Sequence, residues 1–518
     1  FPTRRSSDLK NTKLLLTLAV FVLASSLYAQ DDDFAKYKER QSRTYNEFKD
    51  REKSEYRSFQ DSINKEFASH ISKTWKEYSV FVGEKPEKEP KPKSIPVAEP
   101  NSAPENDVEI EVEEIVEKPV EIIEEKVLEE ITEDVFEEDV TTESSYDNTS
   151  RFSIDLFNPK IALSDVNVFS EIKLSGTDEK SVSALWSKFA DNAYSQTAYQ
   201  IKNIAENKNI NDYGTYLLIT KTAQTLFPNK PNEQIVYTVY LLNQLGFKAK
   251  IARTGNDLIA LISVRQLVYK RSYLNYGKDR FYLFTSKPEE IKDCSSIYTY
   301  DNLMKNCSKS IDLNFYKPLS LGDKVRYVTV KTDDASEINV KINLEDINFF
   351  NNYPHTEIQV YANAEMNDEI NNALLGTLSK QIDGKSDLDA VNYLLDFIYA
   401  SCEYKTDGEQ FGYEKPMFCE ETLYYPYSDC EDNSILFSYL VRKLLGFDVV
   451  LLDYPGHIAT AVKIPGEVNG SYLQLEDGKY IVCDPTYYGA SAGMSMPQYR
   501  NVKLSVIKLN KLKSINYY

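Results

Sequence analysis

The sequence predicts an α+β fold that contains two copies of one unit, each a helix packed on an antiparallel sheet. The main observation is an internal repeat, in which residues 232–247 and 432–447 align without a gap as amphipathic helices that close on Gly-Phe. Three strand patterns follow each helix, at 248–253, 257–264 and 280–284 in the first copy and at 448–453, 457–464 and 479–483 in the second. With 518 residues and a hydrophobic share of 42%, the chain can bury a core in each copy.

The first 29 residues are interpreted as an adapter-like stretch followed by a signal peptide. Lys10 and Lys13 precede the apolar run Leu14–Leu27, and a small residue, Ala29, offers a cleavage point. The run is short for a bilayer span, although a membrane anchor is the alternative. We therefore expect an exported protein, periplasmic or secreted, with no membrane span in the mature chain.

Residues 30–82 predict a long amphipathic helix. Aromatic residues recur every eleven positions, at Phe34, Tyr45, Tyr56, Phe67 and Tyr78. An eleven-residue period keeps such a stripe on one helix face. The helix is expected to self-associate or to pack on the rest of the chain, and binding to a glycan or envelope surface is the alternative.

Residues 83–150 predict an acidic, disordered linker. The segment is rich in Pro and Glu, and most of the formal net charge of −20 falls within it. Nucleic acid is excluded as a partner, because binding phosphates requires clustered Lys and Arg.

Three residues of the second copy predict a catalytic triad. Cys430 falls in the first turn of its helix, capped by Ser428 or Asp429, where backbone N–H groups and the helix dipole favour a thiolate. His457 opens the second strand and Asp484 follows the third. A base beside the sulfur and a carboxylate that orients the base complete the arrangement that a nucleophilic cysteine needs.

The first copy lacks these residues. Lys230, Asp257 and Thr285 stand where Cys430, His457 and Asp484 would align, which predicts a degenerate, structural or ligand-positioning domain. The expected organisation after the linker is a degenerate copy at 151–290, a small β-containing connector at 291–364 and the catalytic copy at 365–518.

The motifs Ser-Asp-Cys430-Glu-Asp-Asn-Ser, Tyr-Pro-Gly-His457-Ile-Ala-Thr-Ala-Val and Cys-Asp484-Pro-Thr-Tyr, in this order, resemble the transglutaminase-like superfamily of the papain-like clan. The strings Asp407–Lys415, Glu420-Glu421 and Gly493–Pro497 are similar to those of an exported bacterial subfamily. The resemblance covers roughly residues 387–497. It implies a papain-like core and acyl transfer, in which a thiolate attacks an amide, a thioester forms, and water or an amine releases the acyl group.

Two further groups are assigned around the triad. The Cys430 N–H can stabilise an oxyanion, and the resemblance implies a side-chain donor, for which Tyr404 is the first choice and Gln410 the second. Substrate-groove residues are expected among the tyrosines near the motifs, namely Tyr425, Tyr427, Tyr487 and Tyr488, with ordinary packing as the alternative. No metal-ligand spacing and no cofactor-binding loop is found.

The function expected from the sequence is that of an exported cysteine hydrolase, an amidase or peptidase. Its partners would be peptide, protein or cell-wall-derived amide substrates. Two alternatives remain open at this point. One is an acyltransferase that cross-links proteins, and the other is a non-catalytic envelope-binding or scaffold protein that uses the degenerate domain and the aromatic helix.

Overall fold

The computed structural model describes residues 58–86, 91–99, 107–116, 149–154, 160–166, 172–190, 195–285, 294–332 and 336–512, together with Arg43, Arg51, Pro104 and Leu156. The predicted signal peptide and about half of the predicted N-terminal helix lie outside these residues. Within the described part of the chain, no helix is both long and apolar enough to cross a membrane.

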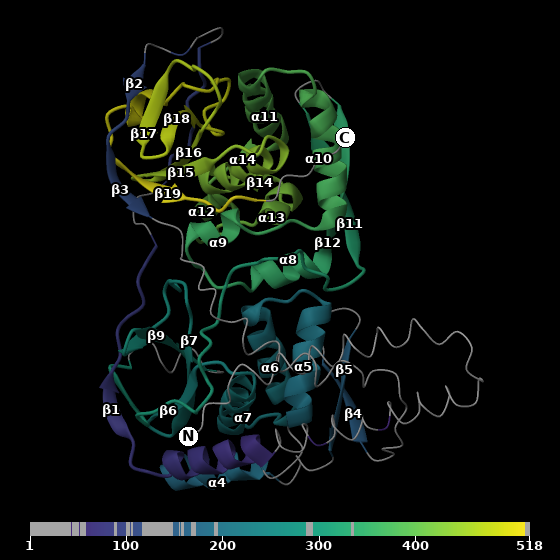
Figure 1. Ribbon diagram of the computed structural model, residues 1–518, viewed down its shortest axis with the longest axis vertical. Helices are drawn as coiled ribbons and strands as arrows, with labels where there is room; N and C mark the ends of the chain where they lie inside the picture. Colours follow the sequence, from purple (N-terminus) through teal and green to yellow (C-terminus); the bar gives the residue numbers. More distant parts are fainter. Residues whose placement is uncertain are drawn as a thin grey trace, which may run out of the picture. The chain divides into compact units, whose positions relative to one another are not determined.

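A seven-stranded sheet forms the C-terminal half of the protein (Figure 1), with the strand order β2-β17-β18-β16-β15-β19-β3. Its strands are β2 (Val108–Glu109), β3 (Val112–Val116), β15 (Val449–Tyr454), β16 (His457–Val462), β17 (Ser471–Leu475), β18 (Gly478–Cys483) and β19 (Leu504–Lys508). Helix α14 (Cys430–Leu444) packs against β15 and β16 through a fully buried apolar face. The predicted order of helix and strands is confirmed.

The first copy repeats this arrangement with α7 (Pro231–Gln244) packed on a six-stranded sheet. Its strands are β1 (Lys76–Ser79), β6 (Ala249–Thr254), β7 (Asp257–Ser263), β8 (Tyr273–Tyr276), β9 (Asp279–Phe284) and β10 (Ser296–Thr299). The order β10-β6-β7-β9-β8 matches β19-β15-β16-β18-β17 strand for strand. The predicted α+β class is confirmed, and these five strands follow the same order in both sheets.

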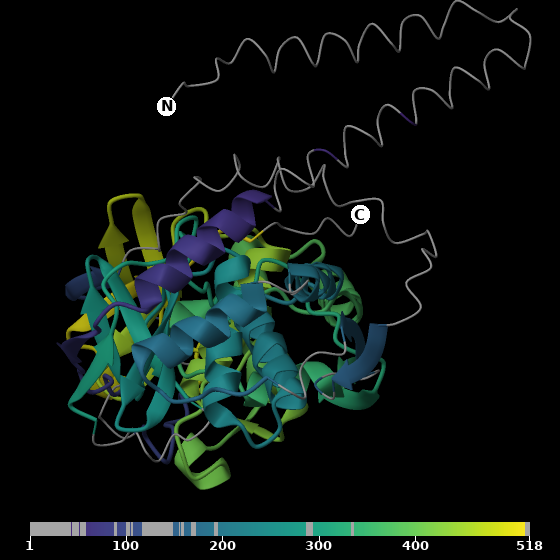
Figure 2. The same cartoon turned by 90° about the horizontal axis from the view of Figure 1, so that it is seen from below.

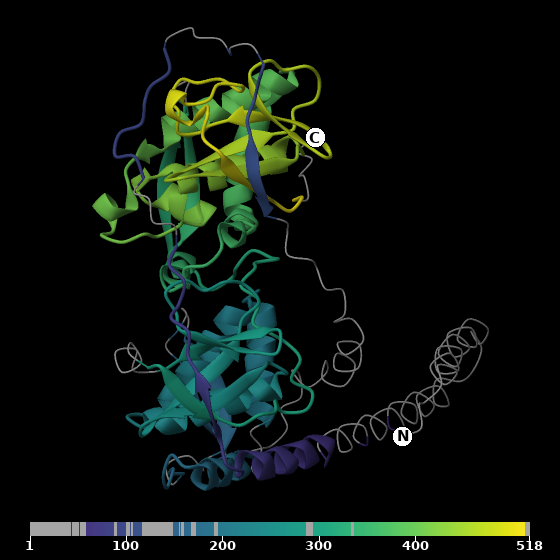
Figure 3. The same cartoon turned by 90° about the vertical axis from the view of Figure 1, so that its left-hand side faces the viewer.

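Part of the segment predicted to be a disordered linker is instead built into the C-terminal sheet, which corrects that prediction. Strand β2 pairs with β17 and strand β3 with β19, both in parallel, so the segment supplies both edges of the sheet (Figure 3). Ile110 lies between them and is buried beside Leu473 and Leu504. Apolar residues alternate with acids in this stretch, a period of two that is typical of a strand, although Val108, Ile115 and Val116 stay exposed at the sheet edges.

The prediction of one long N-terminal helix is wrong for the last part of the segment. Residues 58–71 are helical, but Lys76–Ser79 forms β1, which pairs with β10. The stripe residue Phe67 packs edge-on against Trp186 at 5.1 Å and Tyr300 at 5.5 Å between ring centroids. This helix runs beside α4 (Figure 2), as predicted for a stripe that packs on the rest of the chain.

The remaining elements connect or cover the two sheets. Before the first sheet lie β4 (Thr149–Ile154), β5 (Ile161–Val166), α4 (Glu179–Ala190), α5 (Ser195–Asn207) and α6 (Asp212–Leu226). The connector, predicted to contain β structure, holds the antiparallel pair β11 (Val325–Lys331) and β12 (Glu337–Asn343), with α8 (Leu344–Asn351) and α9 (Ile358–Ala362). The final unit adds α10 (Asp368–Ile382), α11 (Asp387–Ser401), β13 (Glu403–Tyr404), α12 (Asp407–Gln410), α13 (Cys419–Tyr424), β14 (Tyr427–Ser428) and the 3-10 turn Pro497–Tyr499.

Candidate active site

Helix α14 begins at Cys430 because Asp429 caps it. The Asp429 carboxylate accepts the Glu431 N–H at 3.0 Å, and the Asp429 N–H donates to the Asp432 carboxylate at 3.1 Å. This reciprocal pair is a capping box. It fixes Cys430 as the first helical residue, and its side chain is fully buried.

His457 and Asp484 meet as the sequence predicts. His457 Nε2 lies 2.9 Å from Asp484 Oδ2, and both side chains are buried. The other Asp484 oxygen, Oδ1, accepts the Thr486 N–H at 3.0 Å and the Thr486 hydroxyl at 2.9 Å. The carboxylate is thus held at both oxygens. Within the described residues, His457 Nδ1 has no hydrogen-bond partner, so this nitrogen is free to act on a thiol.

The Cys430 sulfur lies beside the strand that carries His457. The backbone N–H of Ile458, the next residue, lies close enough to this sulfur to lower the pKa of the thiol. In the first copy the N–H at the equivalent position, Leu258, donates to the Asn232 side chain at 2.8 Å. In both copies this backbone N–H therefore points toward the preceding helix. Only in the second copy does it lie near a thiol.

The charge state of Cys430 corrects a prediction. Burial raises the pKa of the Cys430 thiol well above its ordinary value, and the charge of Asp429 adds to this. The helix start was expected to favour a thiolate. The neighbouring Glu431 is mostly buried and ion-paired to Lys91 at 3.2 Å. In this arrangement the sulfur is a protonated thiol at neutral pH.

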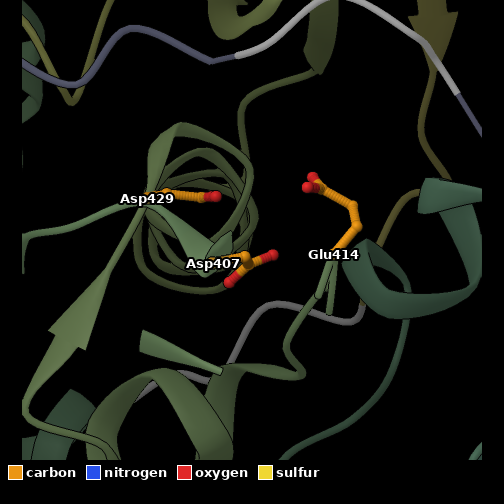
Figure 4. Close-up of side chains that lie close together, drawn as sticks. All are labelled: Asp407, Glu414 and Asp429. Atoms are coloured by element: carbon orange, nitrogen blue, oxygen red, sulfur yellow. The ribbon is translucent and has the colours of Figure 1, made fainter. Parts of the chain in front are cut away.

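Four acidic side chains, which we call the acidic pocket, surround the start of α14: Asp407, Glu414, Asp429 and Glu431. Figure 4 shows Asp407, Glu414 and Asp429 directed toward a common point, and an oxygen of each lies within 4.8 Å of the others. Such a group could hold a cation. The cation present is the Lys91 ammonium, 2.7 Å from Asp429 and also paired with Glu414.

The predicted oxyanion and groove residues separate into two sets. Tyr404 lies near Cys430 and donates its hydroxyl to the Pro92 carbonyl at 2.7 Å, whereas neither amide atom of Gln410 has a partner among the described residues. Tyr487 is buried against Ala98, and Tyr488 accepts the Ala98 N–H at its carbonyl.

The other two residues predicted for the substrate groove make their contacts with residues outside the triad. Tyr425 donates to the Asn351 side chain at 2.9 Å, and the Lys405 ammonium lies 4.7 Å from the Tyr427 ring centroid. Neither contact involves a triad residue, so the structure supports packing roles for Tyr425 and Tyr427 more than roles beside the sulfur.

Sequence reasoning missed three side chains that hold the site. Tyr499 stacks on the His457 ring at 4.8 Å with an interplanar angle of 13°. The Tyr399 hydroxyl donates to the Asp484 carbonyl at 2.9 Å. Lys91 neutralises the acidic pocket from more than three hundred residues away. None of the three has a local signal in the sequence, unlike Thr486, since Asp-Pro-Thr can form such a turn.

The first copy has the corresponding helix and strands but lacks the three residue types of the triad. Lys230 is the N-cap residue of α7, and its ammonium donates to the Ile172 carbonyl at 3.3 Å. Asp257 begins β7, and Thr285 follows β9. The three positions correspond to those of the triad in the second copy, and the residue types present cannot form a thiol–imidazole pair.

Beneath the site, two buried carboxyl groups predict how stability depends on pH. Burial raises the pKa of Asp346 to about 7, and burial with the nearby Asp346 raises the pKa of Glu420 to about 8. In the unfolded chain both titrate near pH 4, so the folded state holds extra protons between pH 4 and 8. Stability should therefore fall as pH rises through this window, by several kcal/mol between pH 5 and 8.

The measurement is urea denaturation from pH 5 to 8. Glu420→Gln should flatten the profile and raise stability at pH 8, because the amide keeps the bond from the Asn367 N–H. The exposed Glu403→Gln variant serves as control and should leave the profile unchanged. A Glu420→Gln profile as steep as that of the parent would contradict the assignment.

Comparison of the chain with protein-family models, with curated proteins and with solved structures found no match in any of the three.

Proposed function

We propose that the C-terminal half is a cysteine hydrolase of transglutaminase-like type, acting on peptide or amide substrates outside the cytoplasm. The observation that carries the proposal is the buried 2.9 Å contact between His457 and Asp484, on strands adjoining the helix that begins at Cys430. The capping box and the nearby Ile458 N–H support it because they position Cys430, and the two-point hold on Asp484 supports it because it positions that carboxylate.

The geometry assigns a role to each nitrogen of His457. Asp484 accepts the proton of Nε2, so Nδ1 is the basic nitrogen. Nδ1 removes the Cys430 proton, and the thiolate attacks the substrate carbonyl to give a tetrahedral oxyanion. The Tyr404 hydroxyl and the Cys430 N–H are the donors assigned to that oxyanion.

Collapse of the intermediate breaks the C–N bond, and the imidazolium returns its proton to the leaving amine. The product is an acyl thioester on Cys430. A water molecule, deprotonated by His457, then attacks the thioester carbonyl, which releases a carboxylic acid and restores the thiol. An amine in place of water would give acyl transfer, the chemistry of a cross-linking enzyme.

One observation favours a second candidate, a non-catalytic binding or scaffold protein. Burial raises the pKa of the Cys430 thiol, whereas a resting nucleophile is usually poised as a thiolate. In this alternative the acidic pocket and the tyrosines would bind a ligand without reacting.

Acetylation by p-nitrophenyl acetate separates the two. In the Lys91→Met variant, which removes the ion pairs that Lys91 makes beside the buried sulfur, the expected result is an acetyl thioester that mass spectrometry maps to Cys430 and not to the other five cysteines. His457→Ala should slow the reaction by about 10²-fold or more. Acetylation spread over several thiols, or a Cys430 rate insensitive to His457→Ala, would support the binding protein instead.

A further inference from the structure

Residues 91–99, which we call the strap, run across the candidate site from the far end of the sequence. The strap begins with Lys91, whose side chain is only 9% exposed and pairs with all four carboxylates of the acidic pocket. Burial alone would lower the pKa of this ammonium, but Glu431 and Asp429 raise it well above its ordinary value. The ammonium is therefore charged and firmly held.

The next residue of the strap, Pro92, is hydrogen-bonded to a side chain that the reaction needs. The Pro92 carbonyl accepts the Tyr404 hydroxyl at 2.7 Å. Tyr404 lies near enough to Cys430 for that residue to help raise the pKa of the tyrosine hydroxyl, and it is the donor assigned to the substrate oxyanion. A backbone carbonyl thus already fills the position of a substrate carbonyl oxygen at this donor.

Further along, the strap is held as an extended peptide. The Ala98 N–H donates to the Tyr488 carbonyl at 2.8 Å, and Val97 pairs with Tyr488 as a parallel bridge. Ala98 is buried with Tyr487 and Met496, and Ile95 packs at the edge of this cluster. Main-chain bonds with small apolar anchors are how peptides are recognised in grooves.

We propose that the strap is an intramolecular inhibitor that fills the substrate groove, and that the acidic pocket is a subsite for a primary ammonium group that Lys91 occupies until the strap is released. The inference rests on the proposed function, since it takes the groove to be that of a substrate. Without Lys91, the four carboxylates would be left close together without a counter-charge. Such a pocket favours a cation over a neutral or negatively charged group. The preferred substrate is accordingly a peptide with a lysine-like side chain.

The strap also accounts for the state of Cys430. The sulfur is fully buried, and among the charges near it Lys91 lowers the thiol pKa whereas Asp429 and Glu431 raise it. Release of the strap would have two opposite effects on the thiol pKa. Loss of the Lys91 charge would raise it, and entry of water to the buried sulfur would lower it.

The test compares Lys91→Met with Lys93→Met. Lys93 lies two residues along the strap and is exposed, so its variant is a matched control. Two quantities are measured: the rate of iodoacetamide labelling of Cys430, and hydrogen exchange of the Ala98 amide. For Lys91→Met we expect labelling about 10-fold faster and faster exchange at Ala98, and for Lys93→Met no change in either. Equal rates in the two variants, by either measure, would overturn the proposal.

A second variant guards against misfolding of the first. Ala98→Asp places a charge against Tyr487 and Met496 and should detach the strap from its other end, with the same gain in labelling. A synthetic peptide of residues 91–99 should then slow labelling of that variant, and the same peptide with Met at its first position should not. Labelling unaffected by either peptide would also overturn the proposal.

The proposed function can fail separately. If labelling rises on release of the strap but does not depend on His457, the strap is an inhibitor of access to a thiol that is not catalytic. If labelling depends on His457 but is equal in Lys91→Met and Lys93→Met, the triad stands and the strap inference is wrong.

Discussion

Replacing Lys415 with methionine is expected to lower the free energy of unfolding by about 3–5 kcal/mol, because it leaves a buried carboxylate without its partner. Lys415 is 8% exposed and pairs with Glu421, which is 1% exposed. The same carboxylate accepts the Phe418 N–H at the start of α13. Burial already raises the pKa of Glu421, so loss of the ammonium would force it to take up a proton or draw in water.

A double variant distinguishes the lost pair from lost packing. Lys415→Met with Glu421→Gln should recover at least half of the loss, since glutamine is neutral and keeps an acceptor for Phe418. Lys385→Met, on an exposed lysine, should change stability by less than about 0.5 kcal/mol. Urea denaturation followed by circular dichroism provides the values. No recovery in the double variant would mean that the methylene packing of Lys415 dominates.

Asp484→Asn is expected to reduce acylation of Cys430 roughly 10³- to 10⁴-fold, with little change in stability. Thr486 donates two hydrogen bonds to Asp484 Oδ1 and would hold the asparagine oxygen there. The amide NH₂ would then face His457 Nε2 and make that nitrogen an acceptor. The imidazole proton would move to Nδ1, which is the nitrogen that must accept the thiol proton.

The nitrophenolate burst from p-nitrophenyl acetate measures this effect in the Lys91→Met background, where access to the sulfur is expected. Asp477→Asn is the control, because Asp477 is 51% exposed and contacts no triad residue in the described structure. A burst rate for Asp484→Asn within a few-fold of the parent would show that Asp484 does not orient the base.

The elements that sequence predicted well are those with a strong local period. Helix α14 and strands β15, β16 and β18 are apolar on a helical or a continuous pattern, and the repeat in the first copy marks the same boundaries a second time. The contact of His457 with Asp484 follows from this, since two adjacent strands of one sheet carry the residues at the same end.

The elements that sequence missed depend on pairing between distant parts of the chain. Lys91 sits in a Pro- and Glu-rich stretch whose average composition indicates disorder, yet four carboxylates elsewhere give this one lysine a site. The helix prediction for Trp75 to Ser79 failed for a similar reason, because β10 offers those residues a strand partner. The composition of a segment describes only that segment. It carries no information about a pairing partner elsewhere in the chain.

The state of Cys430 lies beyond local reasoning too. Its position at a helix start is readable from the sequence, and that position alone favours a thiolate. The degree of burial and the charge of Asp429 act in the opposite direction, and both are known only once the chain is folded.

The edge strands β2 and β3 set an order of events during synthesis. Their partners β17 and β19 are made much later, and contacts such as Glu111 with Lys503 join residues 392 positions apart. At roughly 5–20 residues per second, these strands wait about 20 to 80 seconds for their partners. Residues 107–116 alternate apolar side chains with Asp and Glu, and like charges keep such waiting strands from pairing with other copies. The acidity of this segment is thus a protection for an unfinished chain.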